Sequence, residues 1–191
     1  TRLIAQFAVS VAKKRQSQGY DGRIACFTKL NMLKLSDGYF NEIAHEIVTR
    51  SGIEYEHYIV DDAARRLVQS PEQFDVILMP NFYGDVLSDV GAGTVGGLGL
   101  APSGCYGGGT PYFEPVHGTA PDIAGKKIIN PTATLLSACM MLEHLGHEVE
   151  AKALEAAIRK VYSDGQILPF DQGGSASTSE FCKAVLHSIN V

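Results

Sequence analysis

The segment FDVILM at residues 74–79 is an apolar run of the kind that forms a strand buried on both faces of a sheet. Two other stretches that favour strands precede it, RIACF at 23–27 and the alternating IEYEHYIV at 53–60. Between them lie amphipathic helical patterns, the first of which Ser36 and Asp37 would cap. Strands that alternate with helices predict right-handed crossovers and a mostly parallel or mixed sheet. The fold class is therefore α/β.

Helices and one further strand are expected outside this region. The opening TRLIAQFAVSVAKKRQ carries one apolar stripe, and YFEPVH at 112–117 favours a strand. Asn130 and Pro131 form a helix start, with a cap followed by a first-turn proline. The helix behind them is apolar nearly all round, which predicts a core helix. Two more helical patterns follow, at about 148–162 and 178–189.

The composition excludes several classes of protein. Of 191 residues, 45% are hydrophobic and 19% charged, which disfavours disorder and coiled coil. No apolar stretch approaches the ~18 residues of a membrane span, and the net charge of −5 argues against nucleic-acid binding. Four widely spaced cysteines favour structural thiols in a reducing compartment, either the cytoplasm or the mitochondrial matrix. The chain opens on Thr1, close to its first helix, and we expect a piece of a longer protein.

The segment NFYGDVLSD carries the clearest local site pattern. Asp85 and Asp89 are four residues apart near the expected start of a helix, so their carboxylates share one face and repel each other. A divalent cation would reverse that repulsion, and the hard oxygen ligands suit Mg²⁺ or Mn²⁺ better than Zn²⁺. The spacing alone also allows a simpler alternative, in which one aspartate caps the helix and the other is solvated.

Three more polar residues stand where expected strands end. Lys29 follows the first strand, at the carboxyl edge where open α/β sheets place functional groups, and could act as a general acid or base. An isolated lysine of this kind is more commonly just solvated. Asp61 and Asp62 follow the second strand, where capping of the next helix is the simplest interpretation.

The long loop 113–131 combines His117 with glycines, prolines and polar caps, which is rare in a mere connector. It does not match GxGxxG, so no Rossmann fingerprint is present, and GCYGGGT lacks the lysine of a phosphate-binding loop and fits a plain turn. Nine of the twenty glycines lie between Gly91 and Gly109, which indicates positive φ angles or close backbone approach there.

Taken together, these segments resemble the β-decarboxylating dehydrogenases, the family of isocitrate, 3-isopropylmalate and homoisocitrate dehydrogenases. NFYGDVLSD resembles the family's metal-binding signature, TKLNMLKLSDG its catalytic-lysine segment, and FEPVHGTAPDIAGKKIINPTATLLSACMML its adenosine-binding loop with the following helix. The resemblance runs along the whole chain and implies an isocitrate/isopropylmalate dehydrogenase-like fold with mixed sheets and flanking helices. Residues 1–95 would belong to the dimer-forming, metal- and substrate-binding domain, and 96–191 would be the C-terminal part of the dinucleotide-binding domain.

The resemblance also implies roles for individual residues. Asp85 and Asp89 match two metal ligands, and Asp61 matches a third that the neighbouring subunit contributes. Lys29 matches the lysine that assists proton transfer, also from the neighbour. Asn31 matches a motif position that contacts substrate or cofactor, and we predict a substrate contact. The residues that match the cofactor-binding loop are His117, Gly118, Thr119, Ala120, Asp122 and Asn130.

The implied reaction is metal-dependent oxidative decarboxylation of a 2-hydroxy acid with hydride transfer to NAD. Asp122 favours NAD over NADP, because an anion beside the adenosine ribose accepts hydrogen bonds from free hydroxyls but repels a 2′-phosphate. The implied assembly is a homo-oligomer, a dimer or higher, with an active site shared between subunits. GGLGLAPSG and DQGGSASTSEF resemble the NAD-linked isocitrate enzymes, so isocitrate is the favoured substrate, giving 2-oxoglutarate and CO₂. The alternatives are 3-isopropylmalate or homoisocitrate dehydrogenase, and a noncatalytic regulatory subunit.

The chain departs from the family pattern in two respects. Thr28 and Leu30 stand where His and Ala or Gly are usual, although Lys29 and Asn31 are in place. The family's substrate-binding arginines and catalytic tyrosine lie upstream of everything in these 191 residues, so the chain resembles the C-terminal half only.

Overall fold

The computed structural model describes residues 1–189, and the chain divides into two compact units, Thr1–Gly91 and Ala92–Val191. The predicted boundary near residue 95 lies within a few residues of this division. No helix among residues 1–189 is long and apolar enough to cross a membrane.

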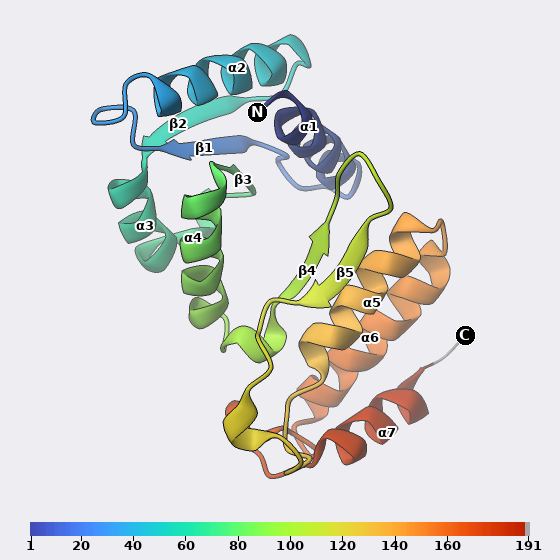
Figure 1. Ribbon diagram of the computed structural model, residues 1–191. Helices are drawn as coiled ribbons and strands as arrows, with labels where there is room; N and C mark the ends of the chain where they lie inside the picture. The colour runs from blue at the N-terminus through green and yellow to red at the C-terminus, as the bar shows by residue number, and fades with distance from the viewer. Residues whose placement is uncertain (190–191) are drawn as a thin grey trace. The chain divides into compact units, whose positions relative to one another are not determined.

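The first unit is a three-stranded parallel sheet between two pairs of helices (Figure 1). Its elements are α1 (Arg2–Ser17), β1 (Ile24–Thr28), α2 (Ser36–Arg50), β2 (Tyr55–Ile59), α3 (Val60–Gln69), β3 (Val76–Leu78) and α4 (Asn81–Thr94). The strand order is β2–β1–β3, and α2 and α3 form the crossovers. The parallel sheet and the α/β fold class predicted from the sequence are therefore confirmed.

The central strand of this sheet is β1, whose five residues are all buried. Because side chains alternate along a strand, Ile24 and Cys26 face the core made with α1 and α2, whereas Ala25 and Phe27 face the core made with α3 and α4. The apolar segment 74–79 forms the shorter β3, which contributes side chains to both cores but pairs only with β1 among residues 1–189.

The second unit packs three helices with an antiparallel hairpin. Its elements are β4 (Pro102–Cys105), β5 (Tyr112–Pro115), α5 (Thr132–His144), α6 (Glu148–Asp164) and α7 (Thr178–Ser188). The Ser137 hydroxyl of α5 donates to the Glu114 carbonyl at 2.8 Å, which fixes the helix on the hairpin. Phe181, completely buried, joins α7 to α6 in a core. The core position predicted for α5 is confirmed by this packing, although Met141 is 40% exposed.

The predicted start of α5 is wrong by one residue. Pro131 precedes the helix instead of opening it, and Thr132 is the first helical residue. The Asn130 side chain still satisfies a free amide there, because its Oδ1 accepts from the Thr132 N–H at 3.0 Å.

The glycine-rich segment needs glycine for two separate reasons. Gly96 and Gly97 have φ of 118° and 112°, a conformation that side chains rarely adopt. A Cβ on Gly99 would lie 2.6 Å from the Asp171 carboxylate, so that side chain would have to shift to admit it. Gly107 to Gly109, in the turn between β4 and β5, meet neither condition. The plain turn predicted for GCYGGGT is the turn of this hairpin.

Candidate functional site

The carboxyl edge of the parallel sheet gathers the polar residues singled out in the first unit. Lys29 directly follows β1, Asp61 lies in the first turn of α3 directly after β2, and α4 begins three residues after β3 ends. All three strands run in the same direction, so these ends lie at one edge of the sheet. Functional groups of open α/β sheets are found at this edge.

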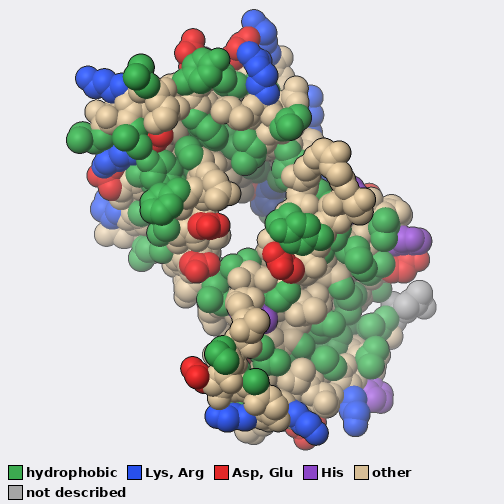
Figure 2. Space-filling model, in the orientation of Figure 1, with side chains coloured by type: hydrophobic (Ala, Val, Ile, Leu, Met, Phe, Trp, Pro, Cys, Tyr) green, Lys and Arg blue, Asp and Glu red, His purple; other side chains and the backbone are tan. Residues whose placement is uncertain are grey.

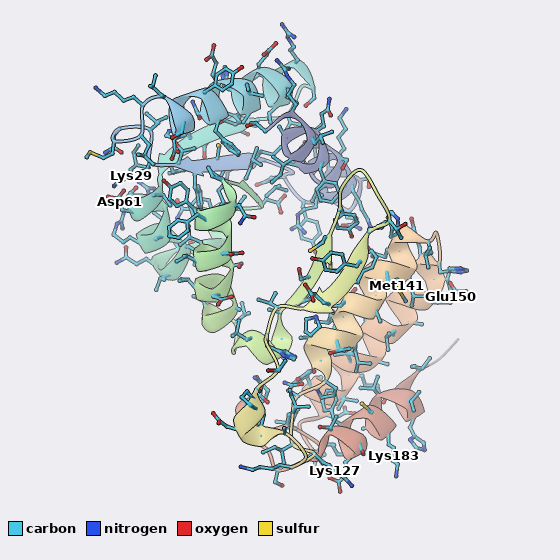
Figure 3. All side chains as sticks on the ribbon, viewed as in Figure 1. Lys29, Asp61, Lys127, Met141, Glu150 and Lys183 are labelled. Carbon is cyan, nitrogen blue, oxygen red and sulfur yellow. The ribbon has the colours of Figure 1, made fainter. Side chains whose placement is uncertain are left out.

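Lys29 and Asp61 are joined by an ion pair. The Lys29 Nζ lies 2.5 Å from the Asp61 Oδ1, and Figure 3 shows the two side chains together. The hydrogen bond from Lys29 holds the pKa of the Asp61 carboxyl below its usual value. Lys29 is therefore neither isolated nor simply solvated, and the pair presents a proton donor beside a carboxylate.

Asp61 and Asp62 differ in their partners. Asp62 accepts hydrogen bonds from Arg65 and Arg66 one turn further along α3, both at 2.6 Å. Neither aspartate caps the helix with its side chain, so the capping interpretation is wrong for both. Asp62 is thus paired with the two arginines of its own helix, whereas Asp61 is paired with Lys29.

The unusual Thr28 before Lys29 is buried and has a half-buried partner. Its hydroxyl lies 2.8 Å from the Nε2 of His57 on β2, and it accepts from the Leu30 N–H at 3.3 Å. Burial lowers the pKa of His57. This threonine–histidine pair, which local sequence patterns do not reveal, anchors the turn that carries Lys29.

The substrate position predicted at Asn31 lies in that same turn, and its side chain is exposed. The turn itself is closed by the Met32 and Leu33 amides, which donate to the Lys29 carbonyl at 2.9 and 2.8 Å. Asn31 thus stays a predicted substrate contact, two residues from the paired lysine.

Asp85 and Asp89 lie on α4, which begins at Asn81, so Asp85 is too far into the helix to cap it. Both side chains are exposed, and neither has a hydrogen bond or ion pair within residues 1–189. The alternative in which one of them is a cap is therefore wrong. Two carboxylates one turn apart without a counter-ion are oxygen ligands available to a hard cation.

The structure does not assemble a complete metal centre within one chain. No group of three histidine, cysteine, aspartate or glutamate side chains that could hold a metal occurs among residues 1–189. Asp61 is engaged with Lys29 and does not join Asp85 and Asp89 in such a group. The two aspartates of α4 would need at least one further ligand from elsewhere.

In the second unit, the predicted cofactor loop follows β5. His117 makes one contact through its Nδ1, 2.9 Å from the Gly118 carbonyl oxygen. Its Nε2 is buried and has no hydrogen-bond partner among the residues described. A buried polar atom without a partner is uncommon, and either an ordered water or a bound molecule would satisfy it.

A pocket of about 440 Å³ lies beside this loop, within the usual size of ligand pockets. It is lined by Thr119, Ala120, Ile123, Ala124, Gly125, Lys127, Ile129, Thr178 and Ser179. Ala120 has a left-handed φ of 44°, which costs a non-glycine residue about 1 kcal/mol or more. Asp122 follows in the short helical turn Pro121–Ile123, and its side chain is exposed.

The pocket wall is fastened to the start of α7. The Thr178 hydroxyl donates to the Ile129 carbonyl at 2.6 Å, and the Thr178 amide donates to the Lys127 carbonyl at 2.9 Å. Ser177 and Glu180 form a reciprocal capping box that fixes this helix end. The predicted site does not include Thr178, since its contact with the loop spans 49 residues of sequence.

Asn130, at the end of the cofactor loop, has an internal role. It is 3% exposed, and its Nδ2 donates to the Asp171 carboxylate at 3.0 Å and to the Tyr162 hydroxyl at 3.2 Å. Because these groups and Thr132 occupy the side-chain amide, a cofactor contact at Asn130 would use its backbone. That contact stays a prediction.

The fold is α/β, and a lysine–aspartate pair lies at the carboxyl edge of its parallel sheet. The chain belongs to the isocitrate/isopropylmalate dehydrogenase family, whose model matches residues 1–185. This confirms the family to which the sequence motifs pointed.

The relatives carry several different names. The chain is 45% identical to a 3-isopropylmalate/3-methylmalate dehydrogenase of Methanocaldococcus jannaschii, over 95% of this chain and 55% of the relative. It is 46% identical to a mitochondrial regulatory subunit of NAD isocitrate dehydrogenase from Dictyostelium discoideum, over 87% and 48%. The crystal structure of isocitrate dehydrogenase from Methylococcus capsulatus matches with a TM-score of 0.90 and 37% identity, over 97% of this chain and 54% of that one. The chain therefore spans about half the length of the curated relatives it matches.

Proposed function

We propose that the full-length protein is a metal-dependent dehydrogenase that oxidises a 2-hydroxy acid with NAD and releases its β-carboxylate as CO₂. The observation that carries this proposal is the Lys29–Asp61 ion pair at the carboxyl edge of the sheet, in a chain of this family. Isocitrate, giving 2-oxoglutarate, is the favoured substrate. The names of the relatives include both isocitrate and 3-isopropylmalate enzymes, so the family allows either acid.

The residues of α4 fit a divalent cation. Asp85 and Asp89 offer exposed carboxylates on one helix face, and within residues 1–189 no cation of the protein neutralises them. Mg²⁺ or Mn²⁺, when bound, would act as a Lewis acid on the oxygen of the reacting carbon. The part of this chain is to hold that ion and, through it, to orient the acid.

Lys29 is the proposed general acid or base. Its ammonium is held by Asp61, and its position directly after β1 places it on the rigid centre of the sheet. In its neutral form Nζ would take the proton that the hydroxyl loses as hydride leaves, and it would return a proton to the substrate as CO₂ leaves. Asp61 has two proposed parts, as the orienting partner of Lys29 and as a metal ligand for a neighbouring subunit.

The loop of the second unit is the proposed NAD site. The unpartnered Nε2 of His117 and the pocket beside Thr119 and Ala120 support an adenosine site there. Asp122 is exposed on the same loop and would accept hydrogen bonds from the ribose hydroxyls, which favours NAD.

A second copy of the chain is the proposed partner. The aspartate pair of α4 leaves room for further ligands, and Asp61 of a second copy would supply one of them in a shared site. Exposed apolar side chains support a dimer interface on the same unit: Phe82 and Val86 of α4 are 74% and 51% exposed, and Val68 of α3 is 58% exposed. Figure 2 shows hydrophobic side chains at the surface of both units.

We propose that the protein is located in a reducing compartment, in keeping with its four free cysteines.

A noncatalytic regulatory subunit is the second candidate, and the similarity to the Dictyostelium regulatory subunit favours it. The presence of Lys29, Asp61, Asp85 and Asp89 argues against it, since a protein without catalysis has no need of all four.

The test is to assay the full-length protein with isocitrate, 3-isopropylmalate and homoisocitrate, using NAD or NADP with Mn²⁺. We expect turnover of isocitrate with NAD, and turnover of none of the three acids would refute the enzyme proposal. Turnover of another of these acids in place of isocitrate would show that isocitrate is not the substrate.

The metal site is tested by Asp85→Asn, with Asp62→Asn as its matched control. Loss of a metal ligand should lower activity by at least about 100-fold, because even outer partners of ligands contribute about 10- to 100-fold. The control removes a carboxylate that is paired with arginines on α3, so its Mn²⁺ dependence should match that of the wild type. Unchanged Mn²⁺ dependence in the Asp85 variant would contradict the assignment.

A further inference from the structure

Asp37 is a buried carboxylate whose role is not the helix cap that the sequence predicts. Its side chain is 5% exposed, and α2 has no side-chain capping hydrogen bond. Removing a charge from water costs several kcal/mol unless hydrogen-bond donors replace the water. The hydrogen-bond donors around Asp37 therefore indicate the role of this buried charge.

Three donors from three different segments converge on it. The Lys29 backbone N–H donates to Oδ2 at 2.7 Å, and the Tyr83 hydroxyl donates to the same oxygen at 3.0 Å. The Ser36 hydroxyl donates to Oδ1 at 3.2 Å. One carboxylate thus joins the lysine turn, the start of α2 and the first turn of α4. Tyr83 is two residues from Asp85.

These contacts fix the backbone of Lys29 from both sides. Its N–H is bound to Asp37, and its carbonyl accepts from the Met32 and Leu33 amides. With both peptide groups held, the position of Nζ depends only on the side-chain torsions and on the pairing with Asp61. The bond to Asp37 is charge-assisted, and such bonds are about twice as strong as neutral ones.

We propose that Asp37 is a positioning residue for the reaction, which holds the Lys29 backbone and the α4 residue Tyr83 in one fixed arrangement. This inference rests on the proposed function of Lys29. Asp37 touches neither substrate nor cofactor in this proposal. It acts through Lys29, whose Nζ has to be placed accurately.

Asp75 provides a matched control for a purely structural carboxylate. Its side chain is 12% exposed, and it accepts from the Gly22 backbone N–H at 2.6 Å and from the Arg15 guanidinium. Like Asp37, it combines a backbone amide with a side-chain donor in the first unit. It directly precedes β3, so it lies at the amino edge of the same sheet, opposite Lys29.

The experiment compares Asp37→Ala, Asp37→Asn and Asp75→Ala in the full-length protein, with activity expressed per folded molecule. Misplacement of a catalytic group by ~1 Å costs up to about 100-fold, so we expect Asp37→Ala to lower kcat about 10- to 100-fold. The KM for NAD should stay within about twofold, because ground-state cofactor binding is untouched. Asp37→Asn keeps one oxygen acceptor without the charge, and its kcat should lie between those of the wild type and Asp37→Ala. Asp75→Ala should lower the unfolding midpoint but not kcat.

Hydrogen exchange at the Lys29 amide gives a readout that does not depend on activity. Asp37→Ala should exchange faster at this amide than the wild type, and Asp75→Ala should not. If Asp37→Ala does not fold, Asp37→Glu replaces it, because the longer side chain keeps the charge and moves the carboxylate by one methylene.

Equal kcat losses in the Asp37 and Asp75 variants, or unchanged protection of the Lys29 amide, would overturn the inference. Failure of the wild type to turn over any acid would instead refute the proposed function, and the exchange measurement alone would then decide whether Asp37 holds this segment.

Discussion

Replacing Thr178 with valine tests whether the start of α7 holds the proposed cofactor loop in shape. Valine has nearly the same size and shape as threonine but lacks the hydroxyl that donates to the Ile129 carbonyl at 2.6 Å. The amide bond from residue 178 to the Lys127 carbonyl does not involve the side chain and should remain. The substitution therefore removes one of the two hydrogen bonds described between this helix end and the loop.

The size of the effect follows from that one bond. A neutral hydrogen bond contributes about 0.5–1.5 kcal/mol net, and an acceptor left unsatisfied costs about 1–3 kcal/mol. The Ile129 residue is half-buried, so water would compensate part of the loss. We expect the free energy of unfolding to fall by about 1–1.5 kcal/mol. If NAD has to restore the loop on binding, its dissociation constant should rise about 5- to 10-fold, since 1.4 kcal/mol corresponds to tenfold.

The assay uses the full-length protein and three measurements. Urea unfolding gives the stability, calorimetric titration gives the dissociation constant for NAD, and initial rates give kcat at saturating NAD. Thr178→Ser is the control, because serine keeps the hydroxyl. We expect serine to bind NAD as the wild type does, and kcat to be unchanged in both variants.

If the valine and serine variants bind NAD equally well while the valine variant shows the predicted loss of stability, the hydroxyl does not shape the cofactor loop. A fall in kcat at saturating NAD would also contradict the prediction, because the loop is proposed to hold the adenosine half and not the reacting atoms.

Two further predictions concern pH and cofactor choice. Burial lowers the pKa of His57, so the unfolded chain binds this proton more readily than the folded one. The contribution of His57 to stability should be complete above the usual pKa of about 6.5 and be lost as the pH falls through that value toward the folded pKa. If a His57→Gln variant shows the same slope of unfolding free energy against pH as the wild type between pH 7 and 5, this prediction is wrong. Asp122→Lys should shift the ratio of kcat/KM values from NAD toward NADP, because it exchanges repulsion of a 2′-phosphate for attraction. An unchanged ratio would remove the argument for NAD.

The elements of this fold could be predicted because their signals are local. The alternation in 53–60 and the apolar stripe of the first helix reflect the periods of 2 and 3.6 residues, which a short window of sequence contains. Errors occurred where the outcome depends on the chain's surroundings. The start of α5 shifted by one residue, and neither Asp61 nor Asp62 caps α3 with its side chain.

The residues of the candidate site also fall into those that local sequence patterns reveal and those that only the folded structure reveals. Lys29 and Asp85 could be proposed from motifs, because each motif is a short, continuous segment whose residue types and spacing can be recognised directly in the sequence. The role of Asp37 could not be predicted, since a carboxylate near a helix start fits a cap equally well. Only its burial and its contact with Tyr83, 46 residues away, distinguish the two roles.

The α/β class, the order of the elements and the family follow from the sequence alone, because periodicity and motif order are properties of the chain. Which of these residues meet depends on how the chain folds. The fold pairs Lys29 with Asp61 across 32 residues, and it leaves Asp85 and Asp89 without a third ligand among residues 1–189. The physical reason is that such contacts depend on how strands pair and helices pack, and the desolvation that selects partners for a buried charge exists only in the folded protein.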